Sequence, residues 1–370
     1  MSSTQTAGAP PGTPRRPPSL RDLRTAAADP YPLYRTLREH FPLLYDEPFG
    51  AWLVSRHDDV RAALTDPRLA PVPSPADGRT PDHREALASV LRGPALSALT
   101  AAVDRGAFVL ARRLAGRETA DLVTEFCDWL PTATALAALG IPYEETTRVH
   151  RWCRAGLDHR GRHPELDAFL RPLVARRRAH PGSDLLSALC TAGDGGHPLP
   201  DEAVTHIAGT LLGAAGGTTA RALASFLGNL LDHPRQLDVI RARPELAAGA
   251  WAESLRRDPP VHVVLRWATV PFGAVPAGAT VACLLGAAGR DRARFADPDR
   301  YDAFRPDPAP LAYGSQPHGC SGALLAGLTA ERGLRALLTT LPGLRRAPGA
   351  RAAPEGRFHR SPPALPVTLR

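Results

Sequence analysis

The spacing of apolar residues along the chain predicts a succession of helices with few strands between them. Helices are predicted from Pro30, from about 58, over 84–117 with an interruption near Gly93, over 120–140 with a break at Pro131, and from 142 to about 179. Further helices are predicted over 183–191, 200–232 and 321–341, with two short helices between 233 and Pro259-Pro260. Short runs with strand character occupy 51–55, 261–270, 274–285 and 364–369. The pattern therefore predicts a mainly α fold with small β-sheets, with no internal repeat and no linker.

The longest predicted helix, over 200–232, contains the locally weak stretch LLGAAGGTTA at 211–220. Each glycine in a helix interior costs about 1 kcal/mol relative to alanine, and Gly213, Gly216 and Gly217 lie close together here. Thr218 and Thr219 follow, and their stiff side chains carry hydroxyls that compete for backbone carbonyls. The pattern alone leaves open what a core helix gains from one weak turn.

The basic residues of the 370-residue chain are all arginines, and the net charge is +8. Because the longest arginine run is Arg176–Arg178, we expect a solvated basic surface or an acidic protein partner, and no nucleic acid. No apolar run approaches the roughly 20 residues of a membrane span, so we expect no membrane association.

The first residues of the chain are rich in proline and glycine and lack the apolar core of a signal peptide. We therefore expect a disordered tail over 1–27 and a single domain over 28–370. The five cysteines are scattered, and their odd number argues against a disulfide framework, which favours a cytoplasmic protein.

Cys320 stands where a glycine-containing loop, YGSQPHGCSG, leads into the last predicted helix. Backbone N–H groups and the dipole at a helix start favour an anion, so we expect them to lower the pKa of this thiol. A thiolate there has three candidate roles: nucleophile, disulfide partner or metal ligand. A zinc site needs more ligands than nearby His318 offers, whereas the iron of haem needs only one axial thiolate.

The loop resembles the haem-binding loop of the cytochrome P-450 family, Phe-Gly-x-Gly-x-His-x-Cys-x-Gly. Gly314, His318, Cys320 and Gly322 match that pattern, while Tyr313 stands for the phenylalanine and Gln316 for a glycine. The resemblance extends from about residue 29 to 369 and implies the P-450 fold, with haem b between the long central helix and the helix that follows Cys320. It implies Cys320 as the axial iron ligand, with Tyr313, Gly314, His318 and Gly322 in the haem-binding loop.

Further matches to the family lie elsewhere in the chain. Glu253 and Arg256 fit its Glu-x-x-Arg pair, and Arg305 fits the third member of a buried ion network. Arg266 fits the arginine that pairs with a haem propionate. His83 fits a second propionate ligand, although Leu87 replaces the arginine that often accompanies it.

The weak turn of the central helix resembles the family's Ala-Gly-x-(Asp/Glu)-Thr-Thr over the distal face of haem. Counting back from His233-Pro234 aligns Thr218 with the first threonine of that motif and Gly217 with the acid. The resemblance implies a catalytic Thr218 that bonds the oxygen species. A glycine cannot relay a proton, so Thr218, ordered water or a polar substrate group would have to do so.

The resemblance implies a haem-thiolate monooxygenase that oxidises a natural-product intermediate by hydroxylation or oxidative coupling. Electrons would come from a separate ferredoxin and ferredoxin reductase, because the chain shows no flavin or NAD fingerprint. We expect a small-molecule substrate, or one bound to a carrier or peptide. The predicted pocket residues are small or apolar: Ala214, Ala215, Gly217, Val263 and Val264.

A second hypothesis is a degenerate family member that has lost catalysis and activates another enzyme, such as a glycosyltransferase. Gly217, Leu87 and Gln316 are departures from the family pattern that point this way. Cys320 points against it, because a helper subunit has no need for an axial iron ligand.

Overall fold

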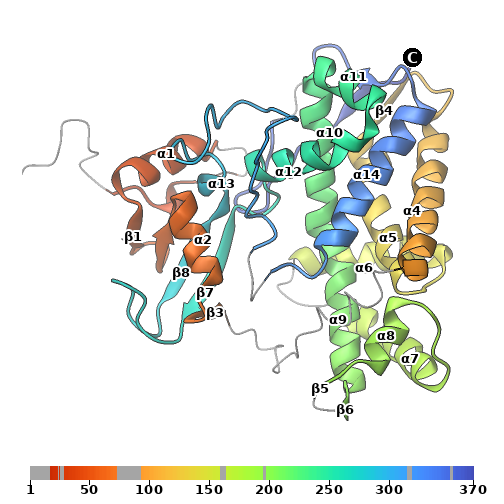
Figure 1. Ribbon diagram of the computed structural model, residues 1–370, viewed down its shortest axis with the longest axis horizontal. Coiled ribbons are helices and arrows are strands. Elements are labelled where there is room, and N and C mark those ends of the chain that lie inside the picture. Colours follow the sequence, from red (N-terminus) through yellow and green to blue (C-terminus); the bar gives the residue numbers. More distant parts are fainter. Residues whose placement is uncertain are drawn as a thin grey trace, which may run out of the picture.

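A five-stranded sheet lies beside a larger body of helices (Figure 1). The computed structural model describes residues 17–23, 25, 29–72, 93–158, 164–194, 197–314, 319–350 and 353–370. The α-helices are α1 (Tyr31–His40), α2 (His57–Thr65), α4 (Gly93–Leu114), α5 (Leu130–Ala138), α6 (Thr146–Asp158), α7 (Pro164–Ala179), α8 (Leu185–Thr191), α9 (Asp201–Ala214), α10 (Ala220–Asp232), α11 (Pro234–Ala242), α12 (Ala247–Arg257), α13 (Leu285–Ala288) and α14 (Ala323–Thr340). The predicted mainly α architecture is confirmed.

The larger sheet has the strand order β1-β2-β8-β7-β3. Its strands are β1 (Leu43–Asp46), β2 (Ala51–Val54), β3 (Leu69–Pro71), β7 (Val263–Ala268) and β8 (Thr280–Leu284). β2 and β8 run parallel, and the other neighbours are antiparallel. The sheet therefore joins the predicted strand at 51–55 to those at 261–270 and 274–285, which lie more than 200 residues later.

A smaller sheet corrects one sequence prediction. β4 (Thr119–Asp121) pairs with β10 (Pro366–Thr368), which also pairs with β9 (Arg345–Arg346). The helix predicted from 120 therefore starts later, as a π-helical turn at Val123–Cys127 followed by α5, which has Pro131 in its first turn. Pairing with the distant C-terminal strand overrides the local helical pattern. A short hairpin of β5 (Gly193–Asp194) and β6 (His197–Pro198) completes the strands of the described residues.

The predicted boundary between tail and domain is wrong. Leu20 is fully buried in a 3₁₀ turn, Leu20–Asp22, and belongs to the core beneath α1 and the sheet. The Ser19 hydroxyl donates to Asp46 Oδ1 of β1 at 2.7 Å. The folded domain therefore includes residues 17–23, because leucines at 20 and 23 extend its apolar core. The remaining expectation of disorder concerns residues 1–16, 24, 26 and 27, which lie outside the described residues.

One helix of the described part, α4, is long and apolar enough by composition to cross a membrane. Its Leu99, Val103, Ala107 and Leu110 are buried in the protein core, and the helix packs against α14 and α5. Its apolar composition is therefore also explained by packing inside the helical body.

The central helix runs through the helical body as α9, a π-helical turn over Ala215–Thr219, and α10 (Figure 1). Gly216 in this π-turn permits close packing: a Cβ added there would lie 2.9 Å from Cys153 Cβ of α6 and 3.3 Å from Thr132 Oγ1 of α5. Gly213, by contrast, has no atom within 4 Å of an added Cβ. Packing against two helices therefore requires glycine at 216 but not at 213.

A buried ion network fixes α12 to the irregular segment that precedes the cysteine loop. Arg256 donates to both carboxylate oxygens of Glu253 at 2.6 and 2.8 Å, and Arg305 Nε donates to Glu253 Oε2 at 3.1 Å. The side chains of Glu253 and Arg256 are fully buried. Arg256 also donates to the carbonyls of Gly289 and Pro298. The predicted network is present, and it ties α12 to residues 289–305.

We predict that Gly216→Ala lowers the free energy of unfolding by about 1–3 kcal/mol, the usual effect of overpacking a filled site. Gly213→Ala is the matched control and should stabilise the protein by up to about 1 kcal/mol, because alanine favours the helix. Urea unfolding followed by circular dichroism measures both. Equal effects of the two substitutions would show that Gly216 is not a packing requirement.

We predict that Glu253→Gln lowers the free energy of unfolding by about 3–5 kcal/mol, because it leaves two buried guanidinium groups without their counter-charge. The control is Asp307→Asn, which removes the partner of Arg294 in an exposed ion pair and should cost less than about 1 kcal/mol. The same urea experiment applies. A loss for Glu253→Gln as small as the control's would contradict the network's role.

Candidate functional site

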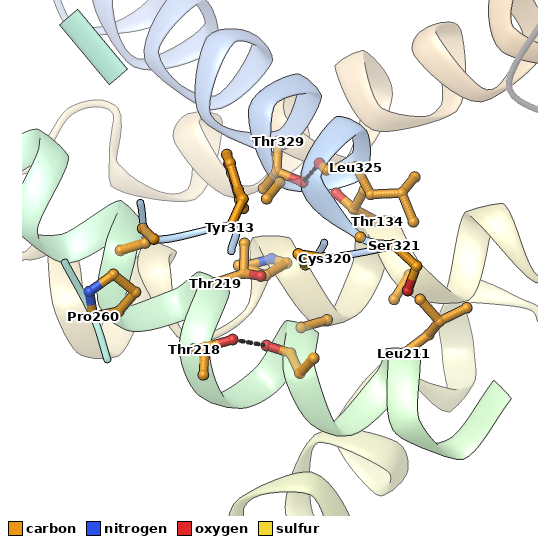
Figure 2. A pocket seen from close by; sticks show the side chains of 18 of the residues that line it. Thr134, Leu211, Thr218, Thr219, Pro260, Tyr313, Cys320, Ser321, Leu325 and Thr329 are labelled. Carbon is orange, nitrogen blue, oxygen red and sulfur yellow. Dashed lines mark hydrogen bonds between the residues drawn. The ribbon is translucent and has the colours of Figure 1, made fainter. Parts of the chain in front are cut away.

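A cavity of about 300 Å³ lies between the central helix and the start of α14. Ala214, Ala215, Thr218 and Thr219 line it from one side, and Cys320 lines it from the other. Figure 2 shows the two threonines and Cys320 around the same space. The structure therefore brings together the weak helix turn and the cysteine loop, which are 100 residues apart in the sequence.

The π-turn accounts for the weak stretch of the sequence. A π-helical turn contains one extra residue, and such turns are frequent at functional sites. The Thr218 hydroxyl donates to the Ala214 carbonyl at 3.1 Å, so it occupies a carbonyl of the widened turn (Figure 2). Gly217 is buried, and its carbonyl accepts a hydrogen bond from Arg221 at 3.1 Å. The turn thus places Thr218 and Thr219 at the cavity, with the Thr218 hydroxyl bonded to a backbone carbonyl of the same helix.

The cysteine loop is closed by its backbone. The Cys320 amide donates to the Tyr313 carbonyl at 2.7 Å. Gly314 has a φ of +67°, a left-handed conformation that favours glycine. Gly322 caps the start of α14. His318 lies outside the described residues, as does His83.

The pKa of the Cys320 thiol differs from the sequence expectation. Cys320 is exposed to solvent, yet partial desolvation by neighbouring atoms raises this pKa, while hydrogen bonds from the backbone N–H groups of Gly322 and Ala323 act to lower it. The expected donors are therefore present, but desolvation outweighs them. A metal cation that binds the sulfur would reverse this balance, because a coordinating thiol is deprotonated.

Tyr313 lies on the wall of the cavity, and its hydroxyl accepts a hydrogen bond from Trp251 Nε1 at 2.8 Å. Burial raises the pKa of this phenol, so it stays protonated at neutral pH. Sequence reasoning did not select Trp251, because nothing in the local pattern of α12 shows which acceptor its indole meets.

The predicted pocket residues divide into two groups. Ala214 and Ala215 line the cavity, whereas Gly217, Val263 and Val264 do not. The two valines pack instead against core residues of the large sheet. Sequence reasoning missed the wall contributed by α5 and α14, because only tertiary packing brings those helices to the cavity: Pro131, Thr134, Ala135, Leu325, Ala326 and Thr329.

Arg266 is buried in β7 and is not among the cavity-lining residues. Its Nε has no hydrogen-bond partner among the described residues, and its Nη1 donates to the neighbouring Leu265 carbonyl at 3.2 Å. Burial lowers the pKa of this guanidinium, and among the described residues Cys283, not a carboxylate, opposes the effect. A buried cation with an unused donor fits an anionic group such as a propionate.

These observations fit a haem. One thiol lines the cavity, and a buried arginine retains a free donor. In the described ranges no group of three or more His, Cys, Asp or Glu side chains is arranged to hold a metal ion. Haem iron needs a single axial thiolate from the protein, so the residues present suffice for it.

Comparison with known proteins gives relatives over most of the chain, although no protein-family model matches it. Cytochrome P450 107B1 of Saccharopolyspora erythraea is 33% identical over 339 residues, which cover 80% of this chain and 83% of that protein. Nocardicin C N-oxygenase of Nocardia uniformis is 32% identical over 385 residues, covering 92% of this chain and 96% of that protein.

Solved structures confirm the fold. The structure of P450BioI in complex with hexadec-9Z-enoic acid ligated acyl carrier protein superposes with a TM-score of 0.80 at 26% identity. The superposition covers 92% of this chain and 99% of that chain. The two relatives at 33% and 32% identity, each matched over most of its length, show that the chain belongs to the cytochrome P450 family of oxidoreductases.

Proposed function

We propose that the protein is a haem-thiolate monooxygenase that oxidises a natural-product intermediate, by hydroxylation or oxidative coupling. The observation that carries this proposal is that Cys320 and Thr218 line one cavity from opposite elements. Haem b, when bound, supplies the redox chemistry that amino-acid side chains lack. The position of Cys320 in the cavity also favours an enzyme over a helper subunit, which needs no axial ligand.

The chain's own residues have distinct roles in this proposal. Cys320 would supply the thiolate to haem iron, Arg266 would bind a haem propionate, and the loop residues Tyr313, Gly314 and Gly322 would shape the space beside the sulfur. His83 and His318 remain predicted haem contacts. Thr218, which lines the cavity, would hold a water or a proton at its Oγ1.

The proton supply differs from that of relatives with an acid before the threonine. No Asp, Glu, His or Arg is among the described residues that line the cavity. Its polar lining consists largely of hydroxyls, including Thr134, Thr210 and Thr329. Hydroxyls pass protons between waters but do not supply them at neutral pH. We therefore propose that solvent or an ionisable group of the substrate supplies the proton that Gly217 cannot.

The substrate is proposed to be a largely apolar molecule, because alanines, leucines and prolines line much of the cavity. Nocardicin C N-oxygenase, by its name, oxygenates a nitrogen of nocardicin C. The related P450BioI was solved with a fatty acid on an acyl carrier protein. A free molecule and one attached to a carrier or peptide are both compatible with the proposal.

The electron source is proposed to be a ferredoxin with its reductase, acting in the cytoplasm. Arg112 and Arg113, both exposed at the end of α4, belong to the basic surface that would attract an acidic ferredoxin. The sequence adds Arg84 and Arg92 as candidates for the same surface, and both lie outside the described residues.

We predict that Cys320→Ser abolishes the Soret band of the reduced, CO-bound protein at the position typical of thiolate ligation, because serine supplies no sulfur to iron. Cys190→Ser is the control: this buried thiol donates only to the Val174 carbonyl and lies away from the cavity, so the band should persist. A wild-type protein that takes up no haem, or a Cys320→Ser variant that keeps the band, would refute the proposed function.

We predict that Arg266→Met weakens haem binding at least tenfold yet does not destabilise the haem-free protein. The reason is that the haem-free protein buries this cation without a carboxylate partner, so replacing it with an apolar side chain is neutral or stabilising by about 1–4 kcal/mol. Haem titration and urea unfolding of the haem-free protein measure the two quantities. Destabilisation of the haem-free protein with unchanged haem affinity would assign Arg266 a purely structural role.

A further inference from the structure

Trp251 and Tyr313 form a partly buried hydrogen-bonded pair beside Cys320. Trp251 in α12 is 5% exposed, and its Nε1 donates to the Tyr313 hydroxyl at 2.8 Å. Both side chains line the cavity that Cys320 also lines. Phe226 of α10 packs edge-on against the indole with ring centroids 5.4 Å apart, which restricts the ring's orientation. The indole N–H is therefore aimed at one acceptor.

Tyr313 connects this pair to the cysteine through its backbone. Its carbonyl accepts the Cys320 amide hydrogen bond at 2.7 Å, while its side chain reaches α12. Gly314 then turns with a positive φ, and its amide donates to the Leu311 carbonyl at 2.9 Å. One residue thus holds the base of the loop and anchors it to a core helix.

The anchor point is a rigid one. Trp251 lies two residues before Glu253, whose ion network fixes α12 to residues 289–305. The same helix therefore fixes both the segment leading to the loop and, through Trp251, the loop itself.

We propose that Trp251 is a positioning residue for Cys320, acting through Tyr313. The proposal rests on the proposed function, in which Cys320 is the axial ligand of haem iron. The indole N–H can only donate. Leaving it buried without an acceptor costs more stability than replacing both partners by apolar groups. The tyrosine at 313, where the family pattern has phenylalanine, is thus matched by a tryptophan that needs its hydroxyl.

The primary experiment compares Tyr313→Phe with Tyr301→Phe in the holoenzyme. Tyr301 is the matched control, because its buried hydroxyl also bonds α12, at Ser254 and Ala250, yet it does not line the cavity. The readout is the rate at which the reduced, CO-bound protein loses its thiolate-position Soret band under mild warming. We expect about a tenfold faster loss for Tyr313→Phe, as one net buried hydrogen bond implies, and no change for Tyr301→Phe.

A double-mutant cycle isolates the pair. Trp251→Phe alone leaves the phenol without its donor, whereas Trp251→Phe combined with Tyr313→Phe leaves neither group orphaned. Each single variant multiplies the rate of band loss by some factor. We expect the factor for the double variant to be smaller than the product of the two single factors. Additive effects, or equal acceleration by Tyr313→Phe and Tyr301→Phe, would overturn the positioning role and leave only general stability.

A second readout uses the haem-free protein. It tests the positioning role of Trp251 even if the protein does not bind haem. Hydrogen exchange of the Cys320 amide reports opening of its bond to the Tyr313 carbonyl. We expect about tenfold faster exchange in Tyr313→Phe and unchanged exchange in Tyr301→Phe. Unchanged exchange in Tyr313→Phe refutes the positioning proposal, whereas a wild-type protein without a thiolate band refutes the proposed function.

Discussion

The carboxylate of Glu253 is the charge on which the cysteine side of the protein depends. It is fully buried and receives hydrogen bonds from two arginines, Arg256 and Arg305, and from the Asp302 amide. Such a network is stable only when every member is satisfied, because each charge was removed from water. Residues 289–314 contain no helix or strand, so side-chain contacts of this kind must define their course toward the loop.

The central helix differs, because its π-turn over Ala215–Thr219 departs from the regular α-helical hydrogen-bond pattern. Gly216 allows α5 and α6 to approach the π-turn, and Thr218 takes a carbonyl within it. The turn is thus held by packing from both sides, which offsets its poor intrinsic helix propensity. The ion network fixes α12, which contributes Trp251 and Leu255 to the cavity wall, and the packed π-turn contributes Thr218 and Thr219.

Much of this arrangement was predictable from sequence, for identifiable reasons. Glu253 and Arg256 stand three residues apart, so their pairing follows from helix geometry. Arg305, Thr218 and Cys320 were predicted from the family pattern. The strand at 119–121, the burial of Leu20 and the approach of Thr134 to the cavity depend on partners far along the chain. The pKa of Cys320 went the other way from expectation, because the local donors are visible in the sequence but the desolvation is not.

The departures from the family pattern also differ in kind once their surroundings are known. Tyr313 is accompanied by a change that makes it fit, since Trp251 supplies the donor for its hydroxyl. Gly217 has no such substitute among the described residues, because the cavity lining there offers hydroxyls and a buried phenol but no carboxylate or imidazole. In the proposed function, the first departure leaves the cysteine loop anchored to α12 by another contact, whereas the second would leave the proton to solvent or substrate. The change at Gly217 would then alter which reactions the protein favours, while Cys320 would still supply the thiolate that haem iron needs.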